Sequence, residues 1–234
     1  MLYLNETEVE SLIKMPDVMR VIDECFKLQG QGKATNQPRR RVYVPDGMMH
    51  VMFASLMREN EGYLGLKTYT AFPGVGVRFI FLLWDANSSE LLSLMEANLL
   101  GQLRTGAASG IAAKYMANES IDEAGLIGTG RQAGTQLEAI CLARDIKRVK
   151  IYSRSKDKRE AFVNRMQKKI NSKLITVDDP SKAVRDSKIV CTMTNAREPV
   201  FDGKDIEPGT TIIAAGSNKI ANRELDDETF RKAS

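Results

Sequence analysis

The tightest restriction on the fold of this chain comes from a glycine-rich loop that joins an apolar run to a helical pattern. The apolar run covers residues 124–127, and Gly128-Thr129-Gly130 follows it directly. With Ala133 in the third small position, the loop matches the G-x-G-x-x-G/A pattern of dinucleotide-binding units. Its glycines allow a tight turn and let backbone amides approach a pyrophosphate. We therefore predict that the following residues bind a cofactor: Gly128, Thr129, Gly130, Arg131 and Gln132. A glycine turn that binds no ligand is the alternative.

Strand-like and helix-like segments alternate around this loop, from about residue 119 to residue 217. Such alternation is typical of a parallel sheet with helices on its faces. We therefore predict a Rossmann-type dinucleotide-binding domain over residues 119–217. Its expected strands are 124–127, 149–152, 174–177, 189–192 and 211–215, and its expected helices are 132–144, 156–169 and 181–186.

The part of the chain before residue 119 has a different pattern. Short strand-like runs separated by turn signals, with no helix between them, predict a mainly antiparallel sheet. Two short helices are expected to precede and pack on it, with Thr7 as the N-cap of the first and Pro16 in the first turn of the second. A long helix over residues 97–118 then leads to the second domain. We predict an α+β domain over residues 1–118. Its expected strands are 41–44, 49–56, 63–70, 78–84 and 91–95.

The residues after the second strand of the Rossmann domain bear on which dinucleotide binds. A site for NAD places an acidic residue there, which accepts hydrogen bonds from the ribose hydroxyls. This chain has Ser153 and Arg154 instead, followed by Ser155 and Lys156. A guanidinium group beside a hydroxyl can bind the 2′-phosphate of NADP by charge-assisted hydrogen bonds. We therefore favour NADP(H) over NAD(H). The alternative is that Arg154 is a solvated loop residue and the cofactor choice is loose.

Composition and charge exclude several classes of protein. With 34 basic and 30 acidic residues, the net charge of +4 is too mixed to indicate nucleic-acid binding. No apolar run approaches the roughly 20 residues that span a bilayer, and the start of the chain lacks a secretory signal. Cys25, Cys141 and Cys191 are too dispersed for a disulfide framework or a zinc knuckle, and His50 is the only histidine. We expect a soluble cytoplasmic protein without a metal site, in which the cysteines and His50 serve packing.

Several further motifs follow one another in a recognisable order. They are Asn36-Gln37-Pro38-Arg39-Arg40-Arg41, Gly65-Leu66-Lys67, Leu103-Arg104-Thr105-Gly106-Ala107-Ala108, Thr192-Met193-Thr194 with Pro199, and Gly216-Ser217 before Arg223-Glu224-Leu225-Asp226. Together with the glycine loop they resemble the ornithine cyclodeaminase/mu-crystallin family over nearly the whole chain. This family includes ornithine cyclodeaminases, alanine dehydrogenases, ketimine and pyrroline-carboxylate reductases, and a crystallin that binds NADPH and thyroid hormone. The resemblance implies a homodimer, with substrate binding and dimerisation in the first domain and the active site in the cleft.

The resemblance also implies roles for individual residues. Arg104 and either Arg39 or Arg41 would bind the substrate α-carboxylate, because a planar guanidinium group matches two carboxylate oxygens. Lys67 would stand near the reacting carbon and amine, where a buried lysine with a lowered pKa can move protons. The alternatives are a solvated edge strand for the arginines and a strand-edge position for the lysine. We expect four residues at the carboxyl ends of strands to border the nicotinamide, where open parallel sheets bind ligands: Thr194, Asn195, Ser217 and Asn218. Thr105 and Thr192 are further predicted cofactor contacts.

Two departures from the family pattern shape the expected activity. The cyclodeaminases have an aspartate where this chain has Asn218, and an amide cannot act as a carboxylate base. With Lys67 and Asn218 as candidate catalytic residues, we expect NAD(P)H-dependent reduction of a cyclic imine, or of a small 2-oxo acid with an amine, or the reverse oxidation at Cα. Ornithine cyclodeamination and NADPH-dependent ligand binding without catalysis are the alternatives. The family usually continues beyond this length, which implies a fragment or truncated product in which residues 218–234 begin a return to the first domain.

Overall fold

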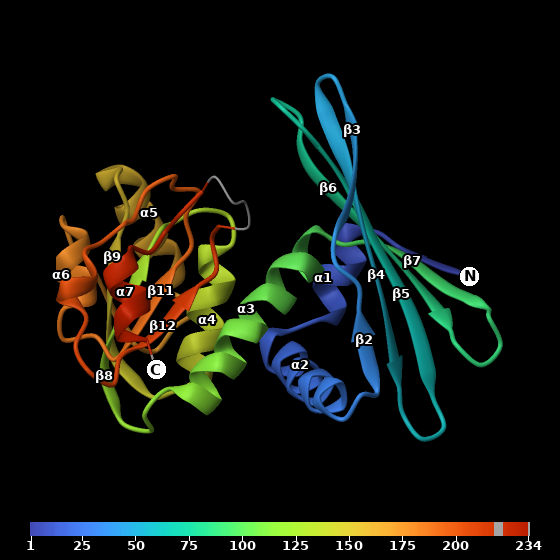
Figure 1. The fold of residues 1–234 in the computed structure, drawn as a ribbon, viewed down its shortest axis with the longest axis horizontal. Coiled ribbons are helices and arrows are strands. Elements are labelled where there is room, and N and C mark those ends of the chain that lie inside the picture. The colour runs from blue at the N-terminus through green and yellow to red at the C-terminus, as the bar shows by residue number, and fades with distance from the viewer. Residues whose placement is uncertain (218–221, 234) are drawn as a thin grey trace. The chain divides into compact units, whose positions relative to one another are not determined.

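The computed structural model describes residues 1–217 and 222–233, in two compact units that divide between residues 104 and 105. The described part of the first unit contains a seven-stranded sheet (Figure 1). Its strands are β1 (Leu2–Leu4), β2 (Ala34–Asn36), β3 (Arg40–Val44), β4 (Gly47–Met57), β5 (Gly62–Phe72), β6 (Gly76–Asp85) and β7 (Leu91–Glu96). They lie in the order β1-β7-β6-β5-β4-β2, and β3 also pairs with β4.

The predicted mainly antiparallel sheet is confirmed. Strands β2 to β7 pair antiparallel, whereas β1 pairs with β7 in parallel. The sequence did not predict β1 and β2. Each is only three residues long, which is too short to show the alternation of a strand. Their place in the sheet depends on a partner far away along the chain.

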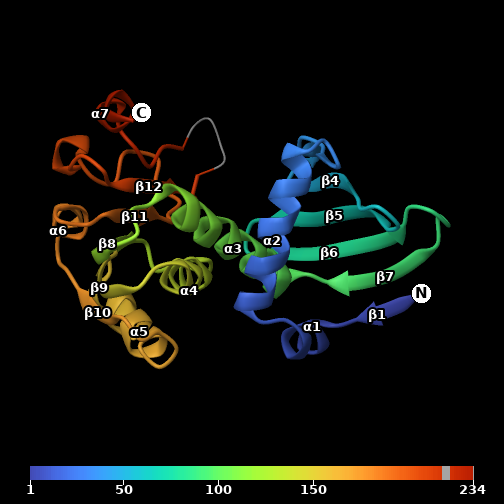
Figure 2. The same cartoon turned by 90° about the horizontal axis from the view of Figure 1, so that it is seen from below.

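Two helices, α1 (Glu6–Leu12) and α2 (Met15–Gly30), precede most of this sheet. The prediction that Thr7 caps the first helix was wrong. Asn5 is the N-cap: its side chain accepts a hydrogen bond from the backbone N–H of Glu8 at 3.0 Å, and the Glu8 carboxylate accepts from the backbone N–H of Asn5 at 2.8 Å. Pro16 lies in the first turn of α2, as predicted. The second helix is not short, and it packs against β2 and β4, crossing the strands as Figure 2 shows.

The second unit is built on a parallel sheet of five strands within its described residues. These are β8 (Ile121–Ile127), β9 (Ile146–Tyr152), β10 (Lys173–Thr176), β11 (Ile189–Thr192) and β12 (Thr211–Ala214). The order β10-β9-β8-β11-β12 reverses direction at β8, which is the strand that leads into the glycine loop. The predicted Rossmann-type sheet is therefore confirmed, with ligand binding expected where the order reverses.

Helices cover both faces of this sheet. They are α4 (Ala133–Ala143), α5 (Lys156–Met166) and α6 (Pro180–Val184). A short 3-10 helix η1 (Gly203–Asp205) and the last helix α7 (Asp227–Lys232) contact each other. Leu126 belongs to the core cluster that contains residues of α4 and α5, whereas its neighbour Ile127 belongs to a second cluster with Val184 of α6. Because both faces are covered, β11 reads as an apolar run, Ile189-Val190-Cys191, and all of its residues are buried.

The three cysteines are free, and packing accounts for them. Cys191 is fully enclosed in β11, where burial raises the pKa of its thiol to about 12. Burial likewise raises the pKa of the Cys141 thiol to about 11. These thiols stay protonated near neutral pH and are poor nucleophiles.

Helix α3 (Asn98–Met116) follows β7, and the division between the units falls within it, between Arg104 and Thr105. The long helix expected over residues 97–118 is confirmed. A Cβ atom at Gly106 would lie 2.3 Å from the Thr135 carbonyl oxygen of α4, so this glycine permits close packing. The domain boundary near residue 118 stays a prediction.

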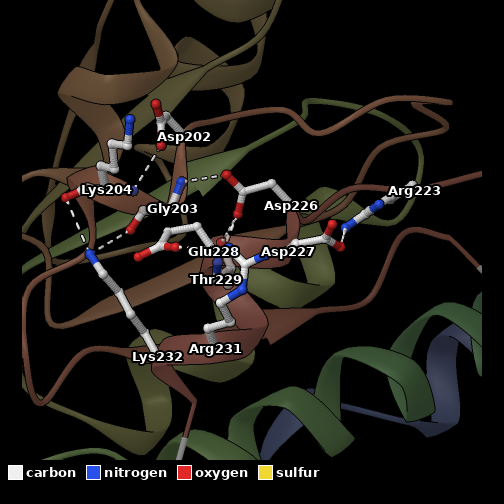
Figure 3. A network of polar contacts seen from close by, with 10 residues as sticks. All are labelled: Asp202, Gly203, Lys204, Arg223, Asp226, Asp227, Glu228, Thr229, Arg231 and Lys232. Carbon is white, nitrogen blue, oxygen red and sulfur yellow. Dashed lines mark hydrogen bonds and ion pairs between the residues drawn. The ribbon is translucent and has the colours of Figure 1, made fainter.

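The last helix, α7, is held against η1 of the same unit by a network of polar contacts (Figure 3). One oxygen of Asp226 accepts a hydrogen bond from the backbone N–H of Thr229 at 2.8 Å and so caps α7, and the other accepts from the backbone N–H of Gly203 at 2.8 Å. At the other end of α7, the Lys232 ammonium group donates to the Gly203 carbonyl oxygen at 2.9 Å. The expectation that residues 218–234 begin a return to the first unit stays a prediction.

Among the described residues, every helix is too short or too polar to cross a membrane.

Candidate active site

One part of the candidate site lies on a face of the first unit's sheet, around Lys67 in the middle of β5. Tyr69 lies two residues further along the strand and therefore faces the same side. Strand pairing places His50 of β4 and Phe79 of β6 opposite Tyr69. The His50 and Tyr69 rings stack with their centroids 4.3 Å apart, and the Phe79 ring centroid lies 4.5 Å from that of Tyr69. A row of three rings therefore crosses the sheet beside Lys67, and His50 is packed within it as expected.

The surroundings of Lys67 lower the pKa of its ammonium group from 10.5 to about 8. Burial is the largest cause, because loss of solvent disfavours the charged form. The positive charges of Arg104 and Arg39 lower the pKa further. The ammonium nitrogen lies 5.8 Å from the centre of the Tyr69 ring and 5.6 Å from that of the Phe79 ring, within the range of cation–π attraction. This lysine can exchange a proton close to neutral pH.

Arg39 and Arg104 complete a group of three cations with Lys67. The Arg39 guanidinium carbon lies 5.9 Å from the centre of the Tyr69 ring. Desolvation, followed by the charge of Arg39, lowers the pKa of the Arg104 guanidinium, which nevertheless stays charged at physiological pH. Arg41 lies on β3 opposite His50, but its side chain is exposed and does not contribute to the pKa shift of Lys67. Three neighbouring cations suit a small ligand that carries a carboxylate.

The glycine loop of the second unit fits the pyrophosphate of a dinucleotide. Gly128 has a φ of +109°, and a Cβ atom there would lie 2.3 Å from the Met193 carbonyl oxygen, so only glycine is accommodated. A Cβ atom at Gly130 would meet nothing within 4 Å, which leaves its backbone open to a ligand. Helix α4 begins without a side-chain cap, so backbone N–H groups of its first turn can donate to a phosphate.

Two polar atoms near this loop are buried without a hydrogen-bond partner among the described residues. They are Oε1 of Gln132 and Oγ1 of Thr192, two of the residues for which the sequence predicts cofactor contacts. An unpaired buried oxygen costs free energy unless a water molecule or a ligand supplies its partner. The donor set and the open backbone together fit a bound dinucleotide.

The loop after β9 holds Ser153, which is half-buried, and Arg154, which is exposed. Sequence reasoning missed Arg159, which is buried on α5. Its guanidinium group donates to the Ser153 carbonyl oxygen at 2.6 Å and lies over the Tyr152 ring, with its central carbon 5.8 Å from the ring centre. Arg159 therefore fixes the backbone from which Arg154 projects. Its charge gave no signal in the sequence, because Lys156 to Arg159 reads as a solvated helical turn.

Two of the residues predicted to border the nicotinamide, Thr194 and Ser217, are brought together by Glu224, whose role the sequence did not indicate. Thr194 and Ser217 both donate to the carboxylate of Glu224, which the sequence offered only as part of a family motif. Thr105 is half-buried on α3 and Asn195 is exposed after β11. Asn218 lies outside the described residues.

Comparison with known proteins gives a consistent result. A model of the ornithine cyclodeaminase/mu-crystallin family matches residues 1–234. The alanine dehydrogenase of Archaeoglobus fulgidus is 36% identical over 238 residues, a match that covers 99% of this chain and 72% of that protein. The structure of Thermococcus litoralis Delta(1)-pyrroline-2-carboxylate reductase in complex with NADH and L-proline superposes with a TM-score of 0.90 at 34% identity, over 100% of this chain and 74% of the other. The structure of an archaeal alanine dehydrogenase dimer with bound NAD superposes with a TM-score of 0.92 at 35% identity, and the match covers 100% of this chain and 72% of the other.

Proposed function

Because this chain belongs to the ornithine cyclodeaminase/mu-crystallin family, we propose that it is an NAD(P)-dependent oxidoreductase that acts on the Cα–N bond of a small amino acid or cyclic imino acid. The observation that carries the proposal is the position of Lys67, whose pKa is lowered to about 8 beside two arginines. A lysine in this state can transfer a proton while the arginines hold a carboxylate. We assign the substrate to residues 1–118 and the cofactor to residues 119–217.

Arg39 and Arg104 bind the substrate carboxylate in this proposal and so fix the position of the adjacent carbon. Such orientation removes much of the entropic cost of the reaction. A dinucleotide held by the Gly128 loop would supply hydride-transfer chemistry at Cα in either direction. Lys67 provides the proton that the imine nitrogen gains on reduction, and it takes that proton back on oxidation. The centres of the Tyr69 and Phe79 rings lie 5.8 Å and 5.6 Å from the ammonium nitrogen, so part of the lysine's surroundings is apolar.

For the cofactor we propose NADP(H) in preference to NAD(H). Arg154 is exposed in the loop after β9, and Arg159 holds the backbone of that loop through Ser153. A guanidinium group at this place suits the 2′-phosphate. The two similar structures described above contain NADH and NAD, so the preference depends on the loop of this chain.

We further propose that the chain forms a homodimer through the face of the first unit's sheet opposite Lys67. This face exposes large apolar side chains, including Phe53 at 46 % and Leu64 at 44 % exposure. Phe53, Leu64, Leu66 and Trp84 line a cavity of about 590 Å³ there. An exposed apolar face of this kind usually marks an interface, and the similar archaeal alanine dehydrogenase is described as a dimer.

The decisive experiment follows the absorbance of NADPH and NADH with three substrates: pyruvate plus ammonia, pyrroline-2-carboxylate, and piperideine-2-carboxylate. We expect oxidation of NADPH with at least one of them. No oxidation of either cofactor with any of them would overturn the proposal. Formation of proline and ammonia from ornithine with catalytic amounts of NAD would establish cyclodeamination instead, and tight NADPH binding without turnover would establish a binding protein.

A further inference from the structure

Glu224 has a buried carboxylate, and both of its oxygens accept hydrogen bonds from other parts of the chain. The residue is 4 % exposed. Oε1 accepts from the backbone N–H of Thr194 at 2.7 Å and from its hydroxyl at 2.6 Å. Oε2 accepts from the backbone N–H of Gly216 at 2.8 Å and from that of Ser217 at 3.2 Å. The donors are uncharged, and they come from two separate segments.

These two segments lie at the same edge of the parallel sheet. Thr194 follows β11, whereas Gly216 and Ser217 follow the neighbouring strand β12. A Cβ atom at Gly216 would lie 2.4 Å from the backbone nitrogen of Thr194 and 2.5 Å from Oε1 of Glu224, so the segments are in direct contact. Glycine is required there, because a side chain would overlap both Thr194 and Glu224.

The same cluster touches the glycine loop. A Cβ atom at Gly128 would lie 3.1 Å from Cγ2 of Thr194. Open parallel sheets bind ligands in the crevice at the carboxyl ends of their strands, where the strand order reverses. In such a sheet the adenosine half of a dinucleotide lies on the side of the second strand, here β9, which leaves the side of β11 and β12 to the other half.

We propose that Glu224 is a positioning residue for the nicotinamide half of the cofactor, because it holds the segments after β11 and β12 in the conformation that receives it. The inference rests on the proposed function, since it takes a nicotinamide dinucleotide as the ligand. Both oxygens of Glu224 are occupied by donors of the protein, so it acts through these segments and not as a base. The Thr194 hydroxyl is also committed, because its proton is donated to Glu224 and its oxygen accepts from the backbone N–H of Ala196 at 3.2 Å.

The test compares two ligands in the wild-type protein and in Glu224→Gln. This substitution keeps the size of the side chain but replaces one acceptor oxygen with an NH₂ group, which cannot accept a hydrogen bond. The ligands are NADPH and 2′-phospho-ADP-ribose, or NADH and ADP-ribose, where the second of each pair lacks the nicotinamide. We expect the variant to bind the reduced dinucleotide about tenfold more weakly, since hydrogen bonds to a charged group are strong. The affinity for the ligand without nicotinamide should stay unchanged.

Two further variants complete the design. Asp226→Asn is the matched control: it makes the same chemical change two residues away, at a carboxylate that binds Gly203 and Thr229 rather than the segments after β11 and β12. It should leave the affinities for both ligands unchanged. Thr194→Val removes one of the four bonds and is expected to give a smaller loss for the reduced dinucleotide alone, so it tests the proposal even if Glu224→Gln does not fold.

Equal weakening of both ligands in Glu224→Gln and in Thr194→Val would overturn the inference, because it would show a general structural role. Unchanged binding of the reduced dinucleotide in both variants would overturn it as well. In these cases the proposed function would stand. A wild-type protein that binds neither NADPH nor NADH would overturn the proposed function, and the inference with it.

Discussion

Lys67 and Tyr69 lie two residues apart on β5 and face the same side of the sheet, with the ammonium nitrogen 5.8 Å from the centre of the tyrosine ring. The ring is held by His50 on one neighbouring strand and by Phe79 on the other. Two ring centres therefore lie 5.8 Å and 5.6 Å from the ammonium nitrogen; desolvation lowers the pKa of Lys67 most, and the positive charges of Arg104 and Arg39 lower it further. Such an environment favours the neutral amine.

The pH dependence of activity follows from this environment. Lys67 loses its proton as the pH rises through about 8. Because reduction needs the protonated form, kcat/KM for the imine substrate should fall above about pH 8, whereas kcat/KM for amino-acid oxidation should rise over the same range. Steady-state rates between pH 6 and pH 10 measure both. Lys67→Gln should remove this inflection together with most of the activity, and an inflection that persists in the variant would show that another group titrates.

The KM for the substrate should show which of the two arginines that the sequence left as alternatives binds the carboxylate. Arg39 acts on the pKa of Lys67 and lies by Tyr69, whereas Arg41 is exposed on β3. Arg39→Gln should raise the KM for the substrate by about tenfold or more, because a charge-assisted hydrogen bond is lost. Arg41→Gln is the matched control and should change KM by less than about twofold. The opposite pattern would assign the carboxylate to Arg41.

Cofactor preference should depend on Arg154. In Arg154→Ala, the affinity for NADPH is expected to fall by about tenfold, since one charge-assisted contact to the 2′-phosphate is removed, while the affinity for NADH stays the same. Fluorescence titration with each cofactor measures the change. Lys158→Ala, a change at an exposed position in the same charged stretch, serves as the control. A parallel loss for both cofactors would contradict the role of Arg154 in discrimination.

The proposed dimer should depend on the apolar sheet face of the first unit. Leu64 is 44 % exposed there, so Leu64→Asp is expected to place a charge in the interface and to give monomers, as measured by light scattering after gel filtration. Leu142→Asp changes a side chain that is 53 % exposed on α4 of the second unit and should leave the dimer intact. If the wild-type chain is a monomer over a wide range of concentrations, the dimer proposal is wrong.

The attachment of α7 can be tested through Asp226. Asp226→Asn keeps an oxygen that can cap the helix but weakens the bond from the backbone N–H of Gly203. We expect the free energy of unfolding of the second unit to fall by about 1 kcal/mol, the usual contribution of one such hydrogen bond. Urea denaturation followed by circular dichroism measures this quantity. A loss well above that value would mean that Asp226 stabilises more than the contacts to Gly203 and Thr229.

Local patterns were sufficient for most of the fold. The alternation of strands and helices after residue 119 and the glycine loop predicted the parallel sheet, because the spacing of apolar residues along a segment reports which faces are buried. Between residues 37 and 96, strand-like runs separated by turn signals, with no helix between them, predicted the antiparallel sheet. The strands β1 and β2 and the cap at Asn5 escaped prediction. A three-residue strand is defined by its partner, and the geometry of the side chain decides which residue caps a helix.

The candidate site divides in a similar way. The residue types and their order along the chain predicted a site for a dinucleotide and one for a carboxylate, and they singled out Lys67, Arg104 and Gly128. Only the tertiary structure decided that Arg39 rather than Arg41 bears on Lys67, that Arg159 supports the loop of Arg154, and that Glu224 joins Thr194 to Gly216. The physical reason is that charge and hydrogen bonding act over a few ångströms in space, between residues that can be far apart in sequence, so their effect appears only when the strands that carry them are paired.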